Sequence, residues 1–173
     1  MRTLNKLIKT KIGEPLGPLL KKEKSMLLYK IFFHIAAVIQ HIWFKLIYGK
    51  SIVFGKKVTW RKRFNLAIES EAKVEIGENC FFNNDCSINA MHQVTIGADT
   101  LFGENVKIYD HNHRFNRTEN VADQGYSVGE VSIGRNCWIC SNVTILKGTR
   151  IEDGCVIAVS YTHLRAHETA ANL

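Results

Sequence analysis

Large apolar residues recur at every sixth position over much of the chain, in four runs separated by three breaks. The runs are Phe54, Trp60 and Leu66; Ile76, Phe82 and Ile88; Ile96, Phe102 and Ile108; and Ile133, Ile139, Ile145, Ile151 and Ile157. A period of six matches neither an amphipathic helix nor a half-buried strand. It is typical of a triangular coil whose three sides are short strands, with stacked turns that bury one apolar column. The pattern predicts four complete turns and a partial fifth.

Two other positions of the hexad carry small residues. Glycine often follows the large apolar residue, and the fourth residue after it is mostly small or β-branched. Four of these fourth residues are Cys80, Cys86, Cys137 and Cys155. Cys137 and Cys140 form a CxxC motif, but the chain has no second one, and Cys137 keeps the corner position of its hexad. We therefore interpret the four corner cysteines as small core residues, not as metal ligands or nucleophiles.

The breaks in the repeat predict where the chain leaves the coil. A step of 10 between Leu66 and Ile76 indicates a short excursion near residues 69–73. A step of 25 between Ile108 and Ile133 predicts a protruding loop at residues 111–128. Loops on a rigid scaffold commonly carry function. The β-helix domain is expected at residues 51–158.

Residues 1–50 are predicted to form a basic helical arm. The stretch from Met26 to Tyr48 is strongly apolar, but Lys30, His34, His41 and Lys45 fall on one helical stripe inside it. Charged residues within the stretch make crossing a bilayer costly, so we favour a helix in the membrane interface. A helix packed on the protein and a spanning helix are the alternatives.

The charge distribution supports an anionic partner for the arm. Residues 1–66 carry a net charge of +13 and residues 67–173 a net charge of −6. The aromatic residues of the arm lie within its apolar run and are not interleaved with Lys and Arg, which favours an anionic membrane surface over nucleic acid. No cleavage site for a signal peptide follows the apolar stretch, so we expect a cytoplasmic protein, peripheral at the inner face of the membrane, with reduced cysteines.

The densest polar cluster of the body closes the third turn, at the start of the long loop. It contains Asp110, His111 and His113. His113 lies five residues after Ile108, where a strand passes into a corner, and a neutral histidine there can accept a proton from a hydroxyl. Asp110 or a backbone carbonyl could fix its tautomer. On spacing alone, a solvated loop histidine without a catalytic role is the alternative.

The gap-free segment from Ile76 to His113, and the later one from Val131 to Thr149, resemble the hexapeptide-repeat sugar O-acetyltransferases of the galactoside and maltose acetyltransferase group. The run Ile108-Tyr-Asp-His-Asn-His-Arg-Phe is most similar to the branch that modifies surface polysaccharides and lipopolysaccharide precursors. The resemblance implies an all-β, left-handed parallel β-helix, here with an N-terminal α-helical arm. It also implies acetyl-CoA as donor, no metal, a homotrimer, and a saccharide acceptor that is lipid-linked or part of a polysaccharide.

The same resemblance assigns roles to single residues. It implies that His113 is the general base and that Asn83, Asp110 and His111 bind the acceptor. Trp138, Ser141 and the backbone at Ala158 are implied in binding coenzyme A. Two departures stand out: Ala90 and Met91 occupy the place of the family's acidic acceptor contact, and Cys140 replaces a glycine.

Two other functions fit parts of the sequence. The γ-class carbonic anhydrases share the fold and bind zinc through histidines, for which His92, His111 and His113 would be the candidates. A non-catalytic β-helix scaffold on a membrane is the second alternative. Residues 159–173 have no period and no counterpart in the family, and we expect them to be an atypical, non-native tail.

Overall fold

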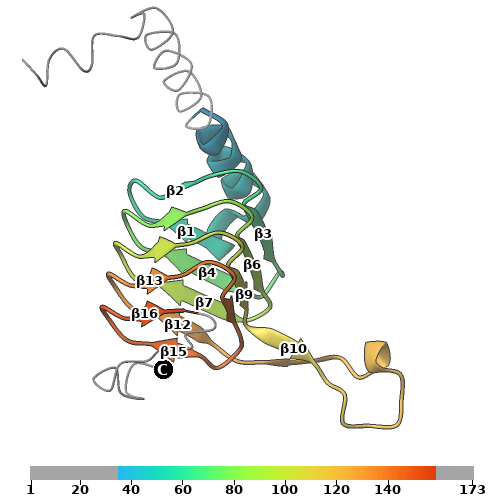
Figure 1. Ribbon diagram of the computed structural model, residues 1–173. Coiled ribbons are helices and arrows are strands. Elements are labelled where there is room, and N and C mark those ends of the chain that lie inside the picture. Colours follow the sequence, from blue (N-terminus) through green and yellow to red (C-terminus); the bar gives the residue numbers. More distant parts are fainter. Residues whose placement is uncertain (1–34, 159–173) are drawn as a thin grey trace, which may run out of the picture. The chain divides into compact units, whose positions relative to one another are not determined.

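The structure is a computed structural model that describes residues 35–158 (Figure 1). The predictions for Lys30 and His34, for the rest of residues 1–34, and for the tail at 159–173 lie outside the described residues. A helix runs through residues 35–48 and is followed by the 3-10 turn η1 (Gly49–Ser51), which leads into the first strand.

Three parallel sheets contain most of the strands. The first sheet consists of β1 (Ile52–Phe54), β4 (Lys73–Ile76), β7 (Gln93–Ile96), β12 (Val131–Ile133) and β15 (Arg150–Ile151). The second consists of β2 (Thr59–Trp60), β5 (Phe81–Phe82), β8 (Leu101–Phe102), β13 (Trp138–Ile139) and β16 (Val156–Ile157). The third consists of β3 (Asn65–Ile68), β6 (Ser87–Ala90), β9 (Lys107–Tyr109) and β14 (Thr144–Ile145).

Successive strands belong to successive sheets, so three strands make one turn of a parallel β-helix (Figure 1). Four complete turns and two strands of a fifth are present, which confirms the predicted solenoid. The hexad residues stack in register: Ile76 pairs with Ile96, and Phe82 with Phe102. Every turn places the large apolar residue of a hexad over its equivalent in the turn before. These residues therefore form one column in the interior of the solenoid.

Aromatic rings fill the interior of the first three turns. The rings of Trp60 and Phe64 stack with centroids 4.8 Å apart, Phe82 follows Phe64 at 4.9 Å, and Phe102 lies parallel to Phe82 at 4.3 Å. All four side chains are buried. Stacked rings of this kind contribute beyond their apolar area, so this column anchors the first three turns.

The corners follow a rule that the sequence analysis missed. The third residue after the large apolar residue has a positive φ in ten hexads. These residues are Lys57, Arg63, Asn79, Asp85, Asp99, Asn105, Asn136, Asn142, Gly148 and Gly154. Asn, Asp and Gly tolerate the left-handed region best, and their recurrence at this position was a readable signal.

Glycine at the position after the large apolar residue permits close stacking of the turns. A Cβ added at Gly97 would lie 2.6 Å from the backbone nitrogen of Arg135 in the next turn. Such a contact is far inside van der Waals distance, so glycine is required there by the neighbouring backbone and not by an unusual φ.

Three of the four corner cysteines are buried, which confirms their place in the core, while Cys155 is half-buried on the last described turn. The Sγ atoms of Cys80 and Cys86 each lie 3.1 Å from a carbonyl oxygen of the next turn, and Cys137 makes the same contact at 3.2 Å. Burial raises the pKa of the Cys80 and Cys86 thiols, so both are protonated at neutral pH.

A hairpin leaves the solenoid between β9 and β12. Its strands are β10 (His111–His113) and β11 (Tyr126–Val128), which pair antiparallel, and the short turn η2 (Val121–Asp123) lies near its tip (Figure 1). The backbone nitrogen of Gly129 donates to the carbonyl of Asp110 at 2.8 Å, which closes the base of the hairpin. The side chain of buried Gln124 donates to the carbonyl of Glu119 at 2.7 Å and accepts the backbone N–H of Arg117 at 3.1 Å. These two hydrogen bonds order the tip.

The helix covers the open edge of the first turn, which has no further turn to pair with among the described residues. Gln40 Nε2 donates to the carbonyl of Phe64 at 2.8 Å, and the hydroxyl of Tyr48 donates to the carbonyl of Leu66 at 2.7 Å. Phe44 is buried against Trp60 and the rest of the aromatic column. Within residues 35–158, no helix is both long and apolar enough to cross a bilayer.

Candidate active site

The predicted site residues lie at two different corners of the solenoid. We call the corner where the chain passes from the second sheet to the third the Asn83 edge, and the corner where it returns from the third sheet to the first the His111 edge. The hairpin of β10 and β11 leaves from the His111 edge. The two edges are separated by the width of the third sheet.

Asp110 is the structural centre of the His111 edge. Its side chain is fully buried. Oδ1 accepts the backbone N–H of Met91 at 2.8 Å, and Oδ2 accepts that of His92 at 2.7 Å. Both donors belong to the preceding turn, so this carboxylate joins two turns where the hairpin departs. A buried carboxylate is stable in such a place only because both of its oxygens accept hydrogen bonds.

The next residue, His111, is oriented by the same carboxylate. Its Nδ1 lies 3.0 Å from Asp110 Oδ1, and its side chain is only 16% exposed. Because the carboxylate oxygens act as acceptors, Nδ1 carries the proton, and Nε2 of the neutral ring is left as the proton acceptor. The rings of Tyr109 and Tyr126 meet the imidazole edge-on, at centroid distances of 6.1 and 5.6 Å. This is the arrangement of an oriented general base.

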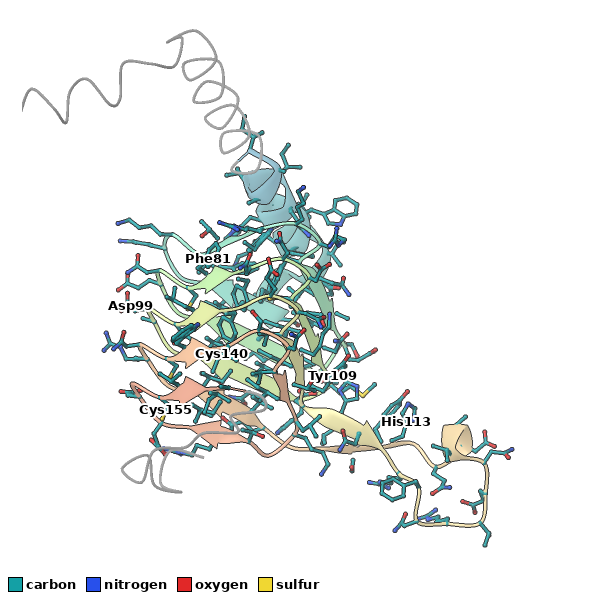
Figure 2. The ribbon with its side chains drawn as sticks, viewed as in Figure 1. Phe81, Asp99, Tyr109, His113, Cys140 and Cys155 are labelled. Atoms are coloured by element: carbon teal, nitrogen blue, oxygen red, sulfur yellow. The ribbon has the colours of Figure 1, made fainter. Side chains whose placement is uncertain are left out.

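His113, the base implied by the resemblance, lies further out on β10. Figure 2 shows it on the hairpin, away from the body to which Tyr109 belongs. It is exposed, and its ring contacts Tyr126 at a centroid distance of 4.4 Å. Among the described residues its ring has no hydrogen-bond partner. Asp110, which we expected to orient His113, contacts the ring of His111 instead.

The residues implied in binding coenzyme A lie along the Asn83 edge. Backbone hydrogen bonds join Asn83 to Phe102 at 3.0 Å and Cys140 to Ile157 at 2.8 Å, so Asn83, Cys140 and Ala158 occupy equivalent positions in the second, fourth and fifth turns. The Cys140 side chain is half-buried and packs against the core, so the loss of glycine there is accommodated.

Trp138 points outward from the second sheet, with its side chain 55% exposed. Its lateral neighbours in the register are Leu101 and Val156, which are also exposed. Together they form an apolar strip on the outer surface, next to the corner that carries Ser141. The Ser141 hydroxyl oxygen accepts the backbone N–H of Glu104 at 3.0 Å.

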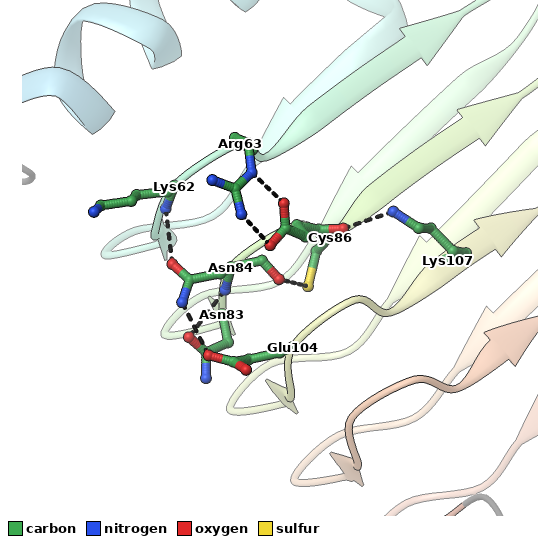
Figure 3. Close-up of polar contacts among 8 residues, drawn as sticks. Lys62, Arg63, Asn83, Asn84, Cys86, Glu104 and Lys107 are labelled. Carbon is green, nitrogen blue, oxygen red and sulfur yellow. Dashed lines mark hydrogen bonds and ion pairs between the residues drawn. The ribbon is translucent and has the colours of Figure 1, made fainter.

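Polar side chains connect the turns along the Asn83 edge (Figure 3). Asn84 accepts the backbone N–H of Lys62 at 3.3 Å and donates to Glu104 at 2.9 Å. Arg63 and Asp85 form a two-pronged ion pair between the first and second turns, and Arg63 lowers the pKa of the Asp85 carboxyl. This network joins the first three turns along the edge.

Asn83 takes part in the same edge. Its Oδ1 accepts the backbone N–H of Asn84 at 2.9 Å and a guanidinium N–H of Arg61 at 3.4 Å. Its Nδ2 has no partner among the described residues. The side-chain oxygen of Asn83 is therefore used in hydrogen bonds within the fold. Its side-chain nitrogen can donate to a bound molecule.

No hydrogen bond, ion pair or ring contact within residues 35–158 joins the Asn83 edge residues to Asp110, His111 or His113. A single chain therefore does not assemble all the predicted site residues in one place. In the same part of the chain, no three His, Cys, Asp or Glu side chains gather as a metal-binding group. His92 contributes its backbone N–H to Asp110.

Two contributors to the His111 edge were missed from the sequence. Tyr126 reaches His111 and His113 because β11 pairs with β10 across the hairpin, and the register pairs His113 with Tyr126. The backbone donors at Met91 and His92 come from the preceding turn. Neither contribution has a local sequence signal, since both depend on pairing between separated segments.

Comparisons with known proteins agree with this class of fold. A family profile described as bacterial transferase hexapeptide (six repeats) matches residues 130–159. The hexapeptide-repeat acetyltransferase VCA0836 of Vibrio cholerae, solved as a complex with acetyl coenzyme A, superposes with a TM-score of 0.53 at 21% identity, over 63% of this chain and 57% of that one. The chain thus shares the β-helix fold of that structure, and its residues 130–159 match the hexapeptide repeat.

Sequence relatives of the chain include proteins named as O-acetyltransferases. The putative lipopolysaccharide biosynthesis O-acetyl transferase WbbJ of Escherichia coli K12 is 28% identical over 79% of this chain and 74% of its own length. Galactoside O-acetyltransferase of the same strain is 33% identical over 50% of this chain and 42% of its own length. The chain is homologous to both at modest identity, and it spans less than half of the second. Both relatives are named as O-acetyltransferases.

Proposed function

We propose that this protein is an acetyl-CoA-dependent O-acetyltransferase that acts on a sugar hydroxyl of a surface polysaccharide or a lipid-linked saccharide precursor. The observation that carries the proposal is the Asp110–His111 pair at the base of the hairpin, on a fold shared with an acetyltransferase of known structure. A sugar acceptor is supported by the names of two relatives, one a lipopolysaccharide enzyme and the other a galactoside enzyme.

His111 is the better candidate for the general base than His113. Its Nδ1 is held by a buried carboxylate, whereas His113 is exposed and its ring lacks a hydrogen-bond partner in the described region. A fixed ring places Nε2 in one direction at no entropic cost during the reaction. His113, whose ring also contacts Tyr126, is assigned to binding of the acceptor. Asp110 is assigned as the positioning residue for His111.

The chemistry is a direct acyl transfer. Acetyl-CoA supplies an acetyl thioester. His111 Nε2 takes the proton of the acceptor hydroxyl while that oxygen bonds to the acetyl carbon, and the carbon–sulfur bond breaks to release the coenzyme A thiolate. The imidazolium then returns the proton to the departing sulfur or to solvent. The products are the acetyl ester and coenzyme A.

No cysteine is proposed as a covalent carrier of the acetyl group. Burial keeps the thiols of Cys80 and Cys86 protonated, and both donate to backbone carbonyls inside the fold. Cys140 is on the Asn83 edge, and burial also raises the pKa of its thiol. A thiol of raised pKa is a poor nucleophile.

Coenzyme A would be held by the outer surface near Trp138, Ser141 and Ala158. The exposed apolar strip of Trp138, Leu101 and Val156 fits the pantetheine chain, which is largely apolar between its amides. Because this strip and His111 lie on different edges, we propose a homotrimer whose sites combine the His111 edge of one subunit with the Asn83 edge of its neighbour. A cyclic arrangement gives three such sites.

The function is tested by mass spectrometry of acetyl-CoA reactions with a panel of nucleotide sugars, simple hexosides and lipid-linked saccharides. The proposal expects one acetyl group to be added to at least one acceptor, with equal release of coenzyme A. Hydration of carbon dioxide by a zinc-containing protein, without acetyl transfer, would instead establish the carbonic anhydrase alternative. Absence of both activities in a folded, trimeric protein would establish a scaffold.

A further inference from the structure

The side of the helix that faces the first turn carries hydrogen-bond donors beside the buried ring of Phe44. Gln40, Lys45 and Tyr48 donate to carbonyls of the first turn at 2.8, 2.9 and 2.7 Å. His41 stacks on Trp60, with ring centroids 5.4 Å apart. The edge of the first turn needs hydrogen-bond donors because no other turn of the described chain covers it, so it takes the side of the helix that carries these donors and Phe44.

The apolar face of the helix is consequently left outside. Between residues 38 and 47, six large apolar side chains on it are each more than half exposed. They are Val38, Ile39, Ile42, Trp43, Leu46 and Ile47. Their spacing of three and four residues places them on one continuous stripe. A contiguous apolar surface of this kind marks an interaction site.

The same end of the solenoid is strongly basic. Between residues 49 and 68 there are six Lys or Arg residues and no Asp or Glu. These residues are Lys50, Lys56, Lys57, Arg61, Lys62 and Arg63. Among them, Lys57 and Arg63 lie at exposed corners of the first turn. The sequence of residues 1–34, outside the described part, contains eight Lys or Arg and two Glu.

We propose that this end of the protein docks on a lipid bilayer that contains anionic phospholipid. The exposed helical face, residues 38–47, enters the boundary between headgroups and acyl chains, and the basic first turn binds the anionic headgroups. An apolar stripe beside a cationic surface is the combination that binds bilayer interfaces. A second copy of the chain would cover the stripe equally well, but it would place like charges together. The proposal does not depend on acetyl transfer.

Vesicle binding by the full chain tests the proposal. The probes are vesicles of phosphatidylcholine alone and of phosphatidylcholine with phosphatidylglycerol, in low and high salt. We expect co-sedimentation with the anionic vesicles that weakens in high salt. Trp43 should show a blue-shifted emission and quenching by brominated acyl chains, and both signals should disappear in Trp43→Phe.

Matched variants separate the apolar from the ionic contribution. Ile39→Asn with Leu46→Asn, both exposed, should weaken partitioning by roughly tenfold or more. Lys50→Gln with Lys56→Gln should weaken it by about fivefold per lysine on anionic vesicles only. Val121→Asn, which removes a similarly exposed apolar side chain at η2, should leave it unchanged.

Sedimentation velocity of the same variants shows whether lipid or a second copy of the chain covers the apolar stripe. If the stripe binds lipid, Ile39→Asn with Leu46→Asn changes vesicle binding but not the mass of the assembly. A lower assembly mass with unchanged vesicle binding would show that a second copy covers the stripe and would overturn the proposal. Equal binding of the wild-type chain and both double variants to anionic vesicles would overturn it as well.

Discussion

The buried carboxylate of Asp110 lies 3.0 Å from Nδ1 of His111, and its two oxygens also accept two backbone N–H groups from the preceding turn. One side chain thus joins two turns of the solenoid and fixes the ring of the next residue. Orientation of the imidazole is built into the packing of the turns, so the candidate base is rigid before any substrate binds.

Asp110→Asn should therefore affect both stability and activity. The amide NH₂ replaces one acceptor, leaves a buried backbone N–H without its partner, and should cost about 1–3 kcal/mol of unfolding free energy. With the NH₂ in the place of Oδ1, the amide also reverses the tautomer of His111, and with the NH₂ in the place of Oδ2 it removes the negative charge that stabilises the imidazolium, so kcat should fall by at least about 100-fold with little change in KM. Chemical denaturation, steady-state kinetics and ¹⁵N NMR of the imidazole measure these effects.

Asp99→Asn is the matched control for that substitution, since Asp99 is an exposed carboxylate of the same turn. It should change stability by less than about 0.5 kcal/mol and leave the His111 tautomer unaltered. An unchanged kcat in Asp110→Asn would contradict the positioning role, whatever happened to the stability.

The shared site predicts complementation between two inactive variants. His111→Gln and Trp138→Ala, each assayed alone at low acetyl-CoA, should be severely impaired. After mixing, unfolding and reassembly, a trimer with sites between subunits should recover about a quarter of wild-type activity, because that share of sites receives both intact residues. No recovery in properly reassembled trimers would mean that both residues serve one chain, contrary to the separation of the two edges.

Thiol labelling tests whether a cysteine carries the acetyl group. Cys80, Cys86 and Cys137 are buried, and burial raises the pKa of the first two, so none of the three should react with iodoacetamide in the native protein. Cys155, which is half-buried, serves as the reactive internal reference. Intact-protein mass spectra after mixing with acetyl-CoA should show no acetylated protein. Detection of an acetyl group on a cysteine would rule out direct transfer.

The contact between the helix and the first turn should weaken at acid pH through His41. Burial, together with the charge of Lys45, lowers the pKa of His41 below its ordinary value of 6.5. The unfolded chain therefore takes up this proton first, so stability is complete above pH 6.5 and falls as the pH drops toward the lowered pKa. Melting temperatures between pH 7.5 and 5 measure this loss.

His41→Phe is the control, because it keeps the ring against Phe54 and Trp60 but cannot titrate. The variant should lose less stability than the wild type over the same pH range. Identical pH profiles of the two proteins would show that His41 does not contribute to the acid sensitivity.

The sequence predicted the solenoid because each hexad repeats the same local geometry, and the interior accepts only a bulky residue such as Ile96 or Phe102 at one position of it. The orientation of the helix was beyond such reasoning. Polar side chains of the helix, including Lys45, donate to carbonyls of the first turn. The need of these carbonyls for donors follows from the open edge of the turn, which only the structure shows. A pattern of apolar and polar residues alone does not say which face turns inward.

The candidate site was predicted in part for a similar reason. Asp110, His111 and His113 were recognised as a cluster, but the choice between the histidines depends on which of them the buried carboxylate reaches. That contact follows from the packing of Asp110 beneath the hairpin, against backbone donors of the preceding turn. The placement of Asn83 and His111 on separate edges likewise follows from the three-sided winding and has no signature in spacing.

The most direct test of the central claim compares His111→Gln with His113→Gln in acetyl-CoA turnover, using an acceptor identified from the sugar panel. Circular dichroism and assembly mass should be unchanged in both variants. We predict that His111→Gln lowers kcat by about 100-fold or more, whereas His113→Gln retains kcat within about tenfold. Full turnover in His111→Gln, with His113→Gln inactive, would contradict the assignment of the base, and full turnover in both would contradict histidine catalysis at this edge.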